Sequence, residues 1–179
     1  LEELRLDGNS LNVALSESIG ELTSLKNFSL AFNQIPGELP ETMGNLRNLI
    51  KLDLTNYLFS GKIPSSIGNC SKLEYIALNK NSFSGTIPET IGALKALKLF
   101  FIEYNNLSGA LPATLVNLIN LERMGIGDNK LEDLPDLSSF EKLSFFTLTD
   151  NYFTFEDLEA NMNINFPEFD ANGAPYTFA

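Results

Sequence analysis

Leucine recurs along this chain at a fixed interval. Six leucines stand 24 residues apart, and a seventh follows after a shortened interval of 22 residues. They are Leu1, Leu25, Leu49, Leu73, Leu97, Leu121 and Leu143. A fixed period in this range indicates one supersecondary unit that is copied and stacked, so that each copy buries its apolar face against its neighbours. The sequence therefore predicts a solenoid.

Each repeat begins with the pattern of a short strand. In the fourth repeat, Ile76 and Leu78 follow Leu73 in the period-2 alternation of a strand that buries one face. An asparagine then occupies repeat position 9, where its amide can bond backbone groups of the turn that lack other partners. We expect a buried ladder of these asparagines, interrupted by Tyr57 in the third repeat. The ladder residues are Asn9, Asn33, Asn81, Asn105, Asn129 and Asn151.

Glycine and proline punctuate the second half of each repeat. Gly85 provides the unusual backbone angles of a turn, and Pro88, three residues later, fixes φ where an extended segment ends. The Ile-Gly pairs that follow, such as Ile91-Gly92, predict short 3₁₀ or helical turns. Val116 replaces this glycine in the fifth repeat, and the sixth repeat is shorter. We therefore expect a tighter convex side and a local bend there.

Together these residues give the pattern LxxLxLxxNxLxGxIPxxIGxLxx, and over about residues 1–153 the chain resembles the leucine-rich repeat family in its 24-residue plant-type form. The resemblance implies an α/β solenoid: a right-handed superhelix with a concave parallel β-sheet, convex 3₁₀ or short helical turns, and a second short sheet. The repeats are residues 1–24, 25–48, 49–72, 73–96, 97–120, 121–142 and a partial repeat, 143–153. Residues 154–179 are expected to form a C-terminal cap and tail, and an N-terminal cap is expected to be absent.

The predicted cap begins with a helix start signal. Thr154 is a candidate N-cap, with Asp157 three residues later in a capping-box arrangement. Phe155, Leu158 and Met162 share a helical face that can cover the last repeat. This ending resembles the last coil of secreted leucine-rich repeat proteins of the Bacteroidota type. Plant receptor ectodomains and polygalacturonase-inhibitor proteins resemble the repeats equally well, but usually carry cysteine pairs in their caps.

Composition excludes several classes of function. The net charge is −11, and ten of the 23 acidic residues lie from Leu131 onward, so no basic stripe is present for nucleic acid. There is no histidine, the single Cys70 is expected to be a small buried hydrophobe, and no phosphate-binding loop or metal-ligand cluster is visible. We predict no enzyme, no cofactor and no metal. No apolar run reaches the ~18 residues that cross a bilayer, so direct membrane insertion of this segment is not expected.

Outward-facing strand positions suggest where a ligand binds. An apolar cluster falls in the fourth to seventh repeats, with Tyr75, Leu99 and Phe145 expected in one column and Phe101 beside it. The predicted binding patch consists of Tyr75, Leu99, Phe101, Glu103, Tyr104 and Phe145. The alternative is that these aromatic residues pack on each other or under the tail. Glu103, Asp128 and Asp150 add a negative rim, although Asp before the ladder asparagine is an ordinary choice in such repeats.

Three Asn-x-Ser sequons are candidate glycosylation sites in a eukaryotic secretory pathway, at Asn27, Asn69 and Asn106. Chance explains three such matches equally well.

Two functions fit these features. The first is a non-catalytic recognition module of an extracellular or cell-surface protein that binds a protein, peptide or glycan on its concave face. The alternative is a structural or adhesive spacer within a larger surface assembly. In both, the chain is expected to be part of a larger protein or assembly.

Overall fold

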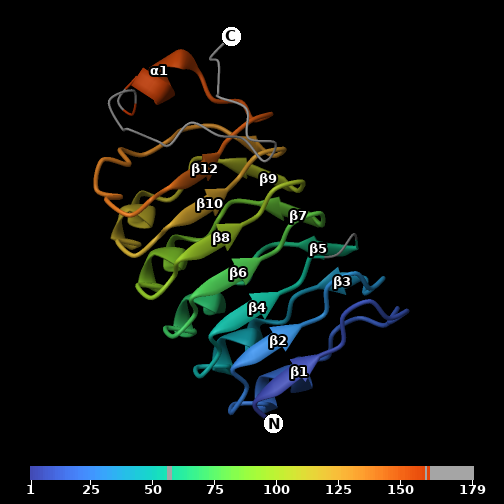
Figure 1. Ribbon diagram of the computed structural model, residues 1–179. Coiled ribbons are helices and arrows are strands. Elements are labelled where there is room, and N and C mark those ends of the chain that lie inside the picture. Colours follow the sequence, from blue (N-terminus) through green and yellow to red (C-terminus); the bar gives the residue numbers. More distant parts are fainter. Residues whose placement is uncertain (56–57, 160, 162–179) are drawn as a thin grey trace.

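The repeats stack into one long parallel sheet. The computed structural model describes residues 1–55, 58–159 and 161. One strand from each repeat joins a seven-stranded parallel sheet in the order β1-β2-β4-β6-β8-β10-β12, which runs the length of the stack in Figure 1. Its strands are β1 (Glu3–Arg5), β2 (Asn27–Ser29), β4 (Lys51–Asp53), β6 (Tyr75–Ala77), β8 (Leu99–Phe101), β10 (Arg123–Gly125) and β12 (Phe145–Thr147). We call its outward surface the concave face.

A second, shorter parallel sheet follows the turn after each main strand. Its order is β11-β9-β7-β5-β3, so neighbouring repeats are again neighbours in the sheet. The strands are β3 (Gly37–Glu38), β5 (Phe59–Gly61), β7 (Ser82–Gly85), β9 (Asn106–Gly109) and β11 (Lys130–Leu131).

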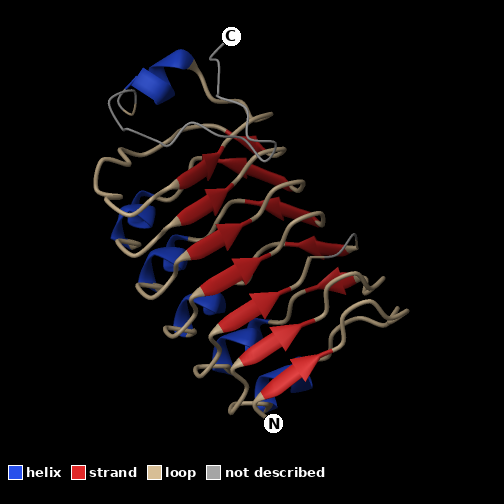
Figure 2. Ribbon diagram, in the orientation of Figure 1, coloured by secondary structure: helices blue, strands red, loops and turns tan. Residues whose placement is uncertain are grey.

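Short 3₁₀ helices complete the first five repeats. They are η1 (Glu17–Glu21), η2 (Glu41–Asn45), η3 (Ser65–Asn69), η4 (Glu89–Ala93) and η5 (Ala113–Asn117). In Figure 2 these helices and the second sheet lie on opposite sides of the seven-stranded sheet. Each helix stacks on its neighbours along the solenoid. The predicted fold is confirmed: a solenoid with a concave parallel sheet, a second short sheet and convex 3₁₀ turns.

The recurring leucines form the interior. Leu25, Leu49 and Leu73 are fully buried, as are the corresponding residues of the fifth and sixth repeats. Leu1 is 67% exposed because it lies in the outermost repeat of the described stack. Cys70 is also fully buried, as expected of a small hydrophobe in this position.

The inner ladder asparagines connect each repeat to the one before it. Asn105 is buried, and its Nδ2 donates at 3.0 Å to the carbonyl oxygens of Ile102 and of Leu78 in the preceding repeat. Its Oδ1 accepts a hydrogen bond from the Phe83 N–H at 3.0 Å. The same three types of bond are made by Asn33, Asn81, Asn129 and Asn151. These amides satisfy backbone groups that neither sheet pairs.

Two positions of the ladder depart from this arrangement. Asn9 is exposed, and its Nδ2 donates within its own repeat, to the Leu6 carbonyl oxygen at 2.9 Å. The expected burial is therefore wrong for Asn9 in the described stack, where no other repeat covers this side of the first repeat. The predicted interruption at Tyr57 lies outside the described residues.

On the convex side, glycine is needed where one full-length repeat packs on the next. A Cβ added at Gly92 would lie 2.3 Å from the carbonyl oxygen of Thr114 in η5. Val116, at the corresponding position of η5, instead faces the shortened sixth repeat, where residues 138–139 form only a turn. Ser139 Oγ, in this turn, donates a hydrogen bond to the Val116 carbonyl oxygen at 3.5 Å. A valine is accommodated because the next repeat supplies no 3₁₀ helix; the expected bend stays a prediction.

The C-terminal cap contains the helix α1 (Phe155–Glu159). The Thr154 N–H donates to Asp157 Oδ2 at 2.6 Å and the Asp157 N–H donates to Thr154 Oγ1 at 3.4 Å, which is the reciprocal geometry of a capping box. Phe155 is 69% exposed, so the prediction that it covers the last repeat is wrong. Leu158 is half-buried, and Met162 lies outside the described residues.

A buried asparagine outside the repeat pattern joins the cap to the sixth repeat. Asn161 Oδ1 accepts from the Leu137 N–H at 2.8 Å, and its Nδ2 donates to the Pro135 carbonyl oxygen at 3.2 Å. The repeat pattern does not predict this role of Asn161, because Asn161 belongs to no repeat position.

Candidate ligand-binding surface

The register of the main sheet fixes the neighbours on the concave face. Tyr75 pairs with Leu99, Leu99 with Arg123, and Arg123 with Phe145. The predicted column is therefore present, but Arg123 separates Leu99 from Phe145. Arg123 was not among the predicted patch residues, although its repeat position places it in this column. Phe101 lies in the adjacent column, between Ala77 and Gly125.

The apolar residues of this surface are packed together with cationic side chains. We use the name aromatic patch for four aromatic residues together with one leucine: Tyr75, Leu99, Phe101, Tyr104 and Phe145. Tyr75 and Phe101 meet edge to face, with ring centroids 6.3 Å apart. The Arg123 guanidinium lies 4.5 Å from the Phe145 ring centroid and 6.0 Å from that of Phe101. Aromatic packing thus explains part of the cluster, while leaving Tyr104 54% exposed.

Tyr104 stands in a left-handed backbone conformation, with φ 58°. The same repeat position has positive φ at Phe32, Lys80, Asp128 and Asp150. This geometry belongs to the turn that ends each main strand and is not a special feature of one site. It places the side chains of Tyr104, Asp128 and Asp150 at the same edge of neighbouring repeats.

Glu103 lies across the neighbouring strand β10. A Cβ added at Gly125 would lie 2.0 Å from Glu103 Oε1, so the carboxyl group occupies the space that a side chain at position 125 would fill. Oε1 accepts a hydrogen bond from Thr147 Oγ1, two repeats away, at 3.4 Å. Oε2 is buried and has no hydrogen-bond partner in the described part of the chain. Burial is the main cause that raises the pKa of Glu103 above its usual value.

Two further carboxyl groups lie along the same edge. Burial and then the charge of Asp150 raise the pKa of Asp128, while a hydrogen bond with the Tyr104 side chain acts in the opposite direction. The charge of Asp128 in turn contributes to the raised pKa of Glu103. We call Glu103, Asp128 and Asp150 the acidic edge; among the described residues they form no salt bridge.

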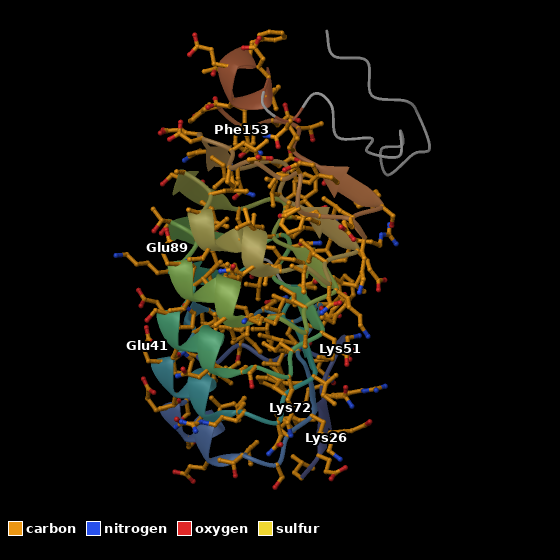
Figure 3. All side chains as sticks on the ribbon, turned by 90° about the vertical axis from the view of Figure 1, so that its left-hand side faces the viewer. Lys26, Glu41, Lys51, Lys72, Glu89 and Phe153 are labelled. Atoms are coloured by element: carbon orange, nitrogen blue, oxygen red, sulfur yellow. The ribbon has the colours of Figure 1, made fainter. Side chains whose placement is uncertain are left out.

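In the first four repeats most charges of the concave face lie in ion pairs. Nζ of Lys26 lies 2.9 Å from Glu2 Oε1, and Nζ of Lys51 lies 3.7 Å from Asp53 Oδ2. Figure 3 shows Lys26 and Lys51 on the side of the stack opposite to Glu41 and Glu89, which extend from the convex helices. Lys51 also lies over the Tyr75 ring, 4.7 Å from its centroid. The aromatic patch therefore borders this surface at the contact of Lys51 with Tyr75.

The three sequon asparagines lie on different surfaces. Asn27 is half-buried in β2, and its Nδ2 donates to Glu3 Oε1 at 3.0 Å. Asn69 is exposed at the end of η3, and Asn106 is exposed in β9. Their glycosylation stays a prediction.

Among the described residues, no group of three His, Cys, Asp or Glu side chains is arranged to hold a metal ion. The described helices are all too short or too polar to cross a membrane.

Comparisons with known proteins identify the family. A profile of the family described as Leucine Rich Repeat matches residues 24–46, 48–70 and 72–94. The ectodomain of the receptor kinase SOBIR1 from Arabidopsis thaliana is 30% identical, over 84% of this chain and 71% of that one, with a TM-score of 0.59. The chain belongs to the leucine-rich repeat family, in its plant-type form. No match was found among curated protein sequences.

Two further structures show the range of relatives. The Arabidopsis receptor kinase HAESA, solved with the peptide hormone IDA and the co-receptor SERK1, is 33% identical over 86% of this chain, with a TM-score of 0.80. A leucine-rich repeat protein of Leptospira interrogans is 30% identical over 91% of this chain and 41% of that one, with a TM-score of 0.75. The chain spans 26% of HAESA, and 22% and 27% of the PEPR1 and TDR receptor chains. The proposed likeness of the C-terminal coil to Bacteroidota proteins stays a prediction.

Proposed function

We propose that this chain is a non-catalytic recognition module that binds a protein or peptide on its concave face. The observation that carries the proposal is the aromatic patch, which lies on the main sheet beside the uncompensated acidic edge. Aromatic anchors with a polar rim are the residue types that dominate the energetics of protein interfaces.

The relatives support a peptide or protein over other classes of ligand. HAESA was solved in complex with a peptide hormone, and it shares 33% identity with this chain. Because the chain spans only about a quarter of that receptor, the recognition role is proposed for this segment alone. Receptor ectodomains among the relatives also favour an extracellular or cell-surface location. Glycan binding remains the less favoured alternative, since none of the named complexes supports it.

Selection of peptides tests this function directly. A random linear-peptide library displayed on phage is selected on the immobilised chain, and the enriched peptides are synthesised and their affinities measured. Removing Phe101 and Tyr104 together (F101A/Y104A) is expected to weaken these peptides by about 100-fold, because anchors of this kind each contribute ~1–2 kcal/mol.

The chain offers a matched control for this experiment. Phe32 has the same repeat position as Tyr104 and is 63% exposed, but it lies in the second repeat. Phe32→Ala is expected to leave the affinities unchanged. If no peptide is enriched over a blank surface, the proposed function is wrong; equal losses in both variants would contradict the assigned surface.

A further inference from the structure

The concave face is not evenly neutralised along its length. Arg5 lies 3.7 Å from Glu3, and Lys98 lies 2.7 Å from Glu74, in addition to the two pairs of the second and third repeats. Beyond these pairs the surface carries the acidic edge, for which the described residues provide no cationic partner. Two nearby cations keep their charge but face aromatic rings and form no salt bridge with these carboxylates: Arg123 lies over Phe145, and Lys80 lies 5.7 Å from the Tyr104 ring centroid. The fifth to seventh repeats therefore present three carboxyl groups that form no ion pair among the described residues.

Beyond Arg123, strand β10 and the turn that follows it have glycine at the next two outward positions. Gly125 pairs with Phe101 on one side and with Thr147 on the other. Gly127, the next outward position, also lacks a side chain, and a Cβ there would meet Thr149 Oγ1 at 3.0 Å. The Glu103 carboxyl group occupies the space that a side chain at Gly125 would fill. One of its oxygens has no hydrogen-bond partner among the described residues. Partly desolvated carboxylates of this kind are stabilised by an approaching cation.

We infer that the peptide segment bound over the fifth to seventh repeats presents a basic side chain, Arg or Lys, to Glu103, Asp128 and Asp150. The charged end of that side chain complements the acidic edge, and its methylene groups pack on the exposed ring of Tyr104. An organic cation is favoured over a metal ion because the described carboxylates are not arranged as a metal-binding group. This inference rests on the proposed function and adds the class of residue that the surface selects.

The test compares charge-matched peptides on charge-matched proteins. Peptides are selected from the random phage library on the wild-type chain, and each Arg in an enriched peptide is replaced by citrulline and each Lys by Gln. The wild-type chain is expected to bind the basic peptides about 10- to 100-fold more tightly than the neutral ones. In E103Q/D128N/D150N this preference is expected to disappear. Asparagine tolerates the left-handed conformation at positions 128 and 150, so the variant keeps the backbone of the turn.

A control variant removes the same charge from the other side of the solenoid. Glu17, Glu21 and Glu89 are exposed on the convex helices η1 and η4. E17Q/E21Q/E89Q is expected to retain the preference, which shows that position and not net charge is responsible. The inference is overturned if enriched peptides bind equally without basic residues, or if the convex variant loses the preference as well. In both cases enriched peptides exist, so the proposed function stands; absence of any enrichment overturns the proposed function itself.

Discussion

On the concave face, most charged residues of the first four repeats lie in ion pairs, whereas Glu103, Asp128 and Asp150 of the last three repeats do not. In the first repeat a hydrogen bond from Lys26 lowers the pKa of Glu2, so the carboxylate is stabilised in its ionised form. In the fifth repeat burial raises the pKa of Glu103, whose ionised form is penalised. Both residues stand on the same scaffold, a main strand or its end in the same parallel sheet. The difference shows that the repeat determines the backbone, whereas the outward side chains and their ionisation vary from one repeat to another.

The convex side changes at nearly the same place along the stack. From the first to the fourth repeat a glycine packs closely on the next 3₁₀ helix, whereas Val116 of the fifth repeat faces only a turn. A solenoid is stabilised by contacts between neighbouring repeats, so the fifth and sixth repeats have a different interface from the others. The predictions below test how far this division extends, from the largest expected effect to the smallest.

Adding one methyl group at Gly92 tests the close packing of the first part. Gly92→Ala is expected to lower the free energy of unfolding by about 3 kcal/mol, because its Cβ would lie 2.3 Å from the Thr114 carbonyl oxygen and the backbone must shift. Chemical denaturation measures the change. Val116→Gly, at the equivalent position of the next repeat, is expected to cost only about 1 kcal/mol through backbone entropy. Similar losses in both variants would show that the two interfaces are equivalent.

The ladder, in contrast, is expected to be the same in both parts. Asn33→Ala and Asn129→Ala should each cost about 2 kcal/mol, because each removes a buried amide that bonds an N–H group and a carbonyl oxygen of the preceding repeat. Asn9→Ala is the control and should have a much smaller effect, since Asn9 is exposed. The control also sets the scale of the comparison. If the losses of unfolding free energy in Asn33→Ala and Asn129→Ala differ by more than the loss in Asn9→Ala, the first and last repeats differ in their interior as well as on their surfaces.

The periodic part of the fold could be predicted because each repeat position has one dominant physical requirement. Leu49 must be buried and Asn105 must bond the turn, and both requirements are visible in single residues. The exposure of Phe155 was not predictable in this way, since it depends on how the cap is oriented. Asn161 escaped attention because it substitutes for a repeat contact from outside the period.

The candidate surface was predictable only in part, for a related reason. Tyr75, Phe101 and Phe145 could be found from their repeat positions, and the register confirms the columns in which they lie. The conformation of Glu103 depends on a pair of residues, because it reaches Thr147 only where Gly125 leaves space. A single column of residue types does not reveal such a dependence.

Adding a methyl group at Gly125 tests whether this glycine is responsible for the raised pKa of Glu103. Gly125→Ala is expected to displace the carboxyl group toward solvent, so that the pKa of Glu103 returns toward its ordinary value. Titration of the side-chain carboxyl carbons by NMR, with E103Q to assign the signal, measures the shift. Gly127→Ala is the matched control, because its Cβ would meet the movable Thr149 hydroxyl and leave Glu103 in place. An unchanged pKa in Gly125→Ala would contradict this role of the glycine.

The smallest effect concerns how stability changes with pH, and it should have opposite signs in the two parts. The lowered pKa of Glu2 means that its stabilising contribution is present above the ordinary carboxyl value of 4.5 and is lost as the pH falls through the folded-state pKa. The raised pKa of Glu103 means that the folded protein retains this proton to higher pH than the unfolded chain, so the contribution of Glu103 to stability falls as the pH rises above 4.5.

The difference in Tm between wild type and E2Q should therefore grow in favour of wild type from about pH 3 to about pH 7. The corresponding difference for E103Q should move in favour of the variant over the same range. Comparing each variant with itself at two pH values removes the constant cost of the amide, and a shared sign would mean that the fifth repeat neutralises its charge as the first repeat does.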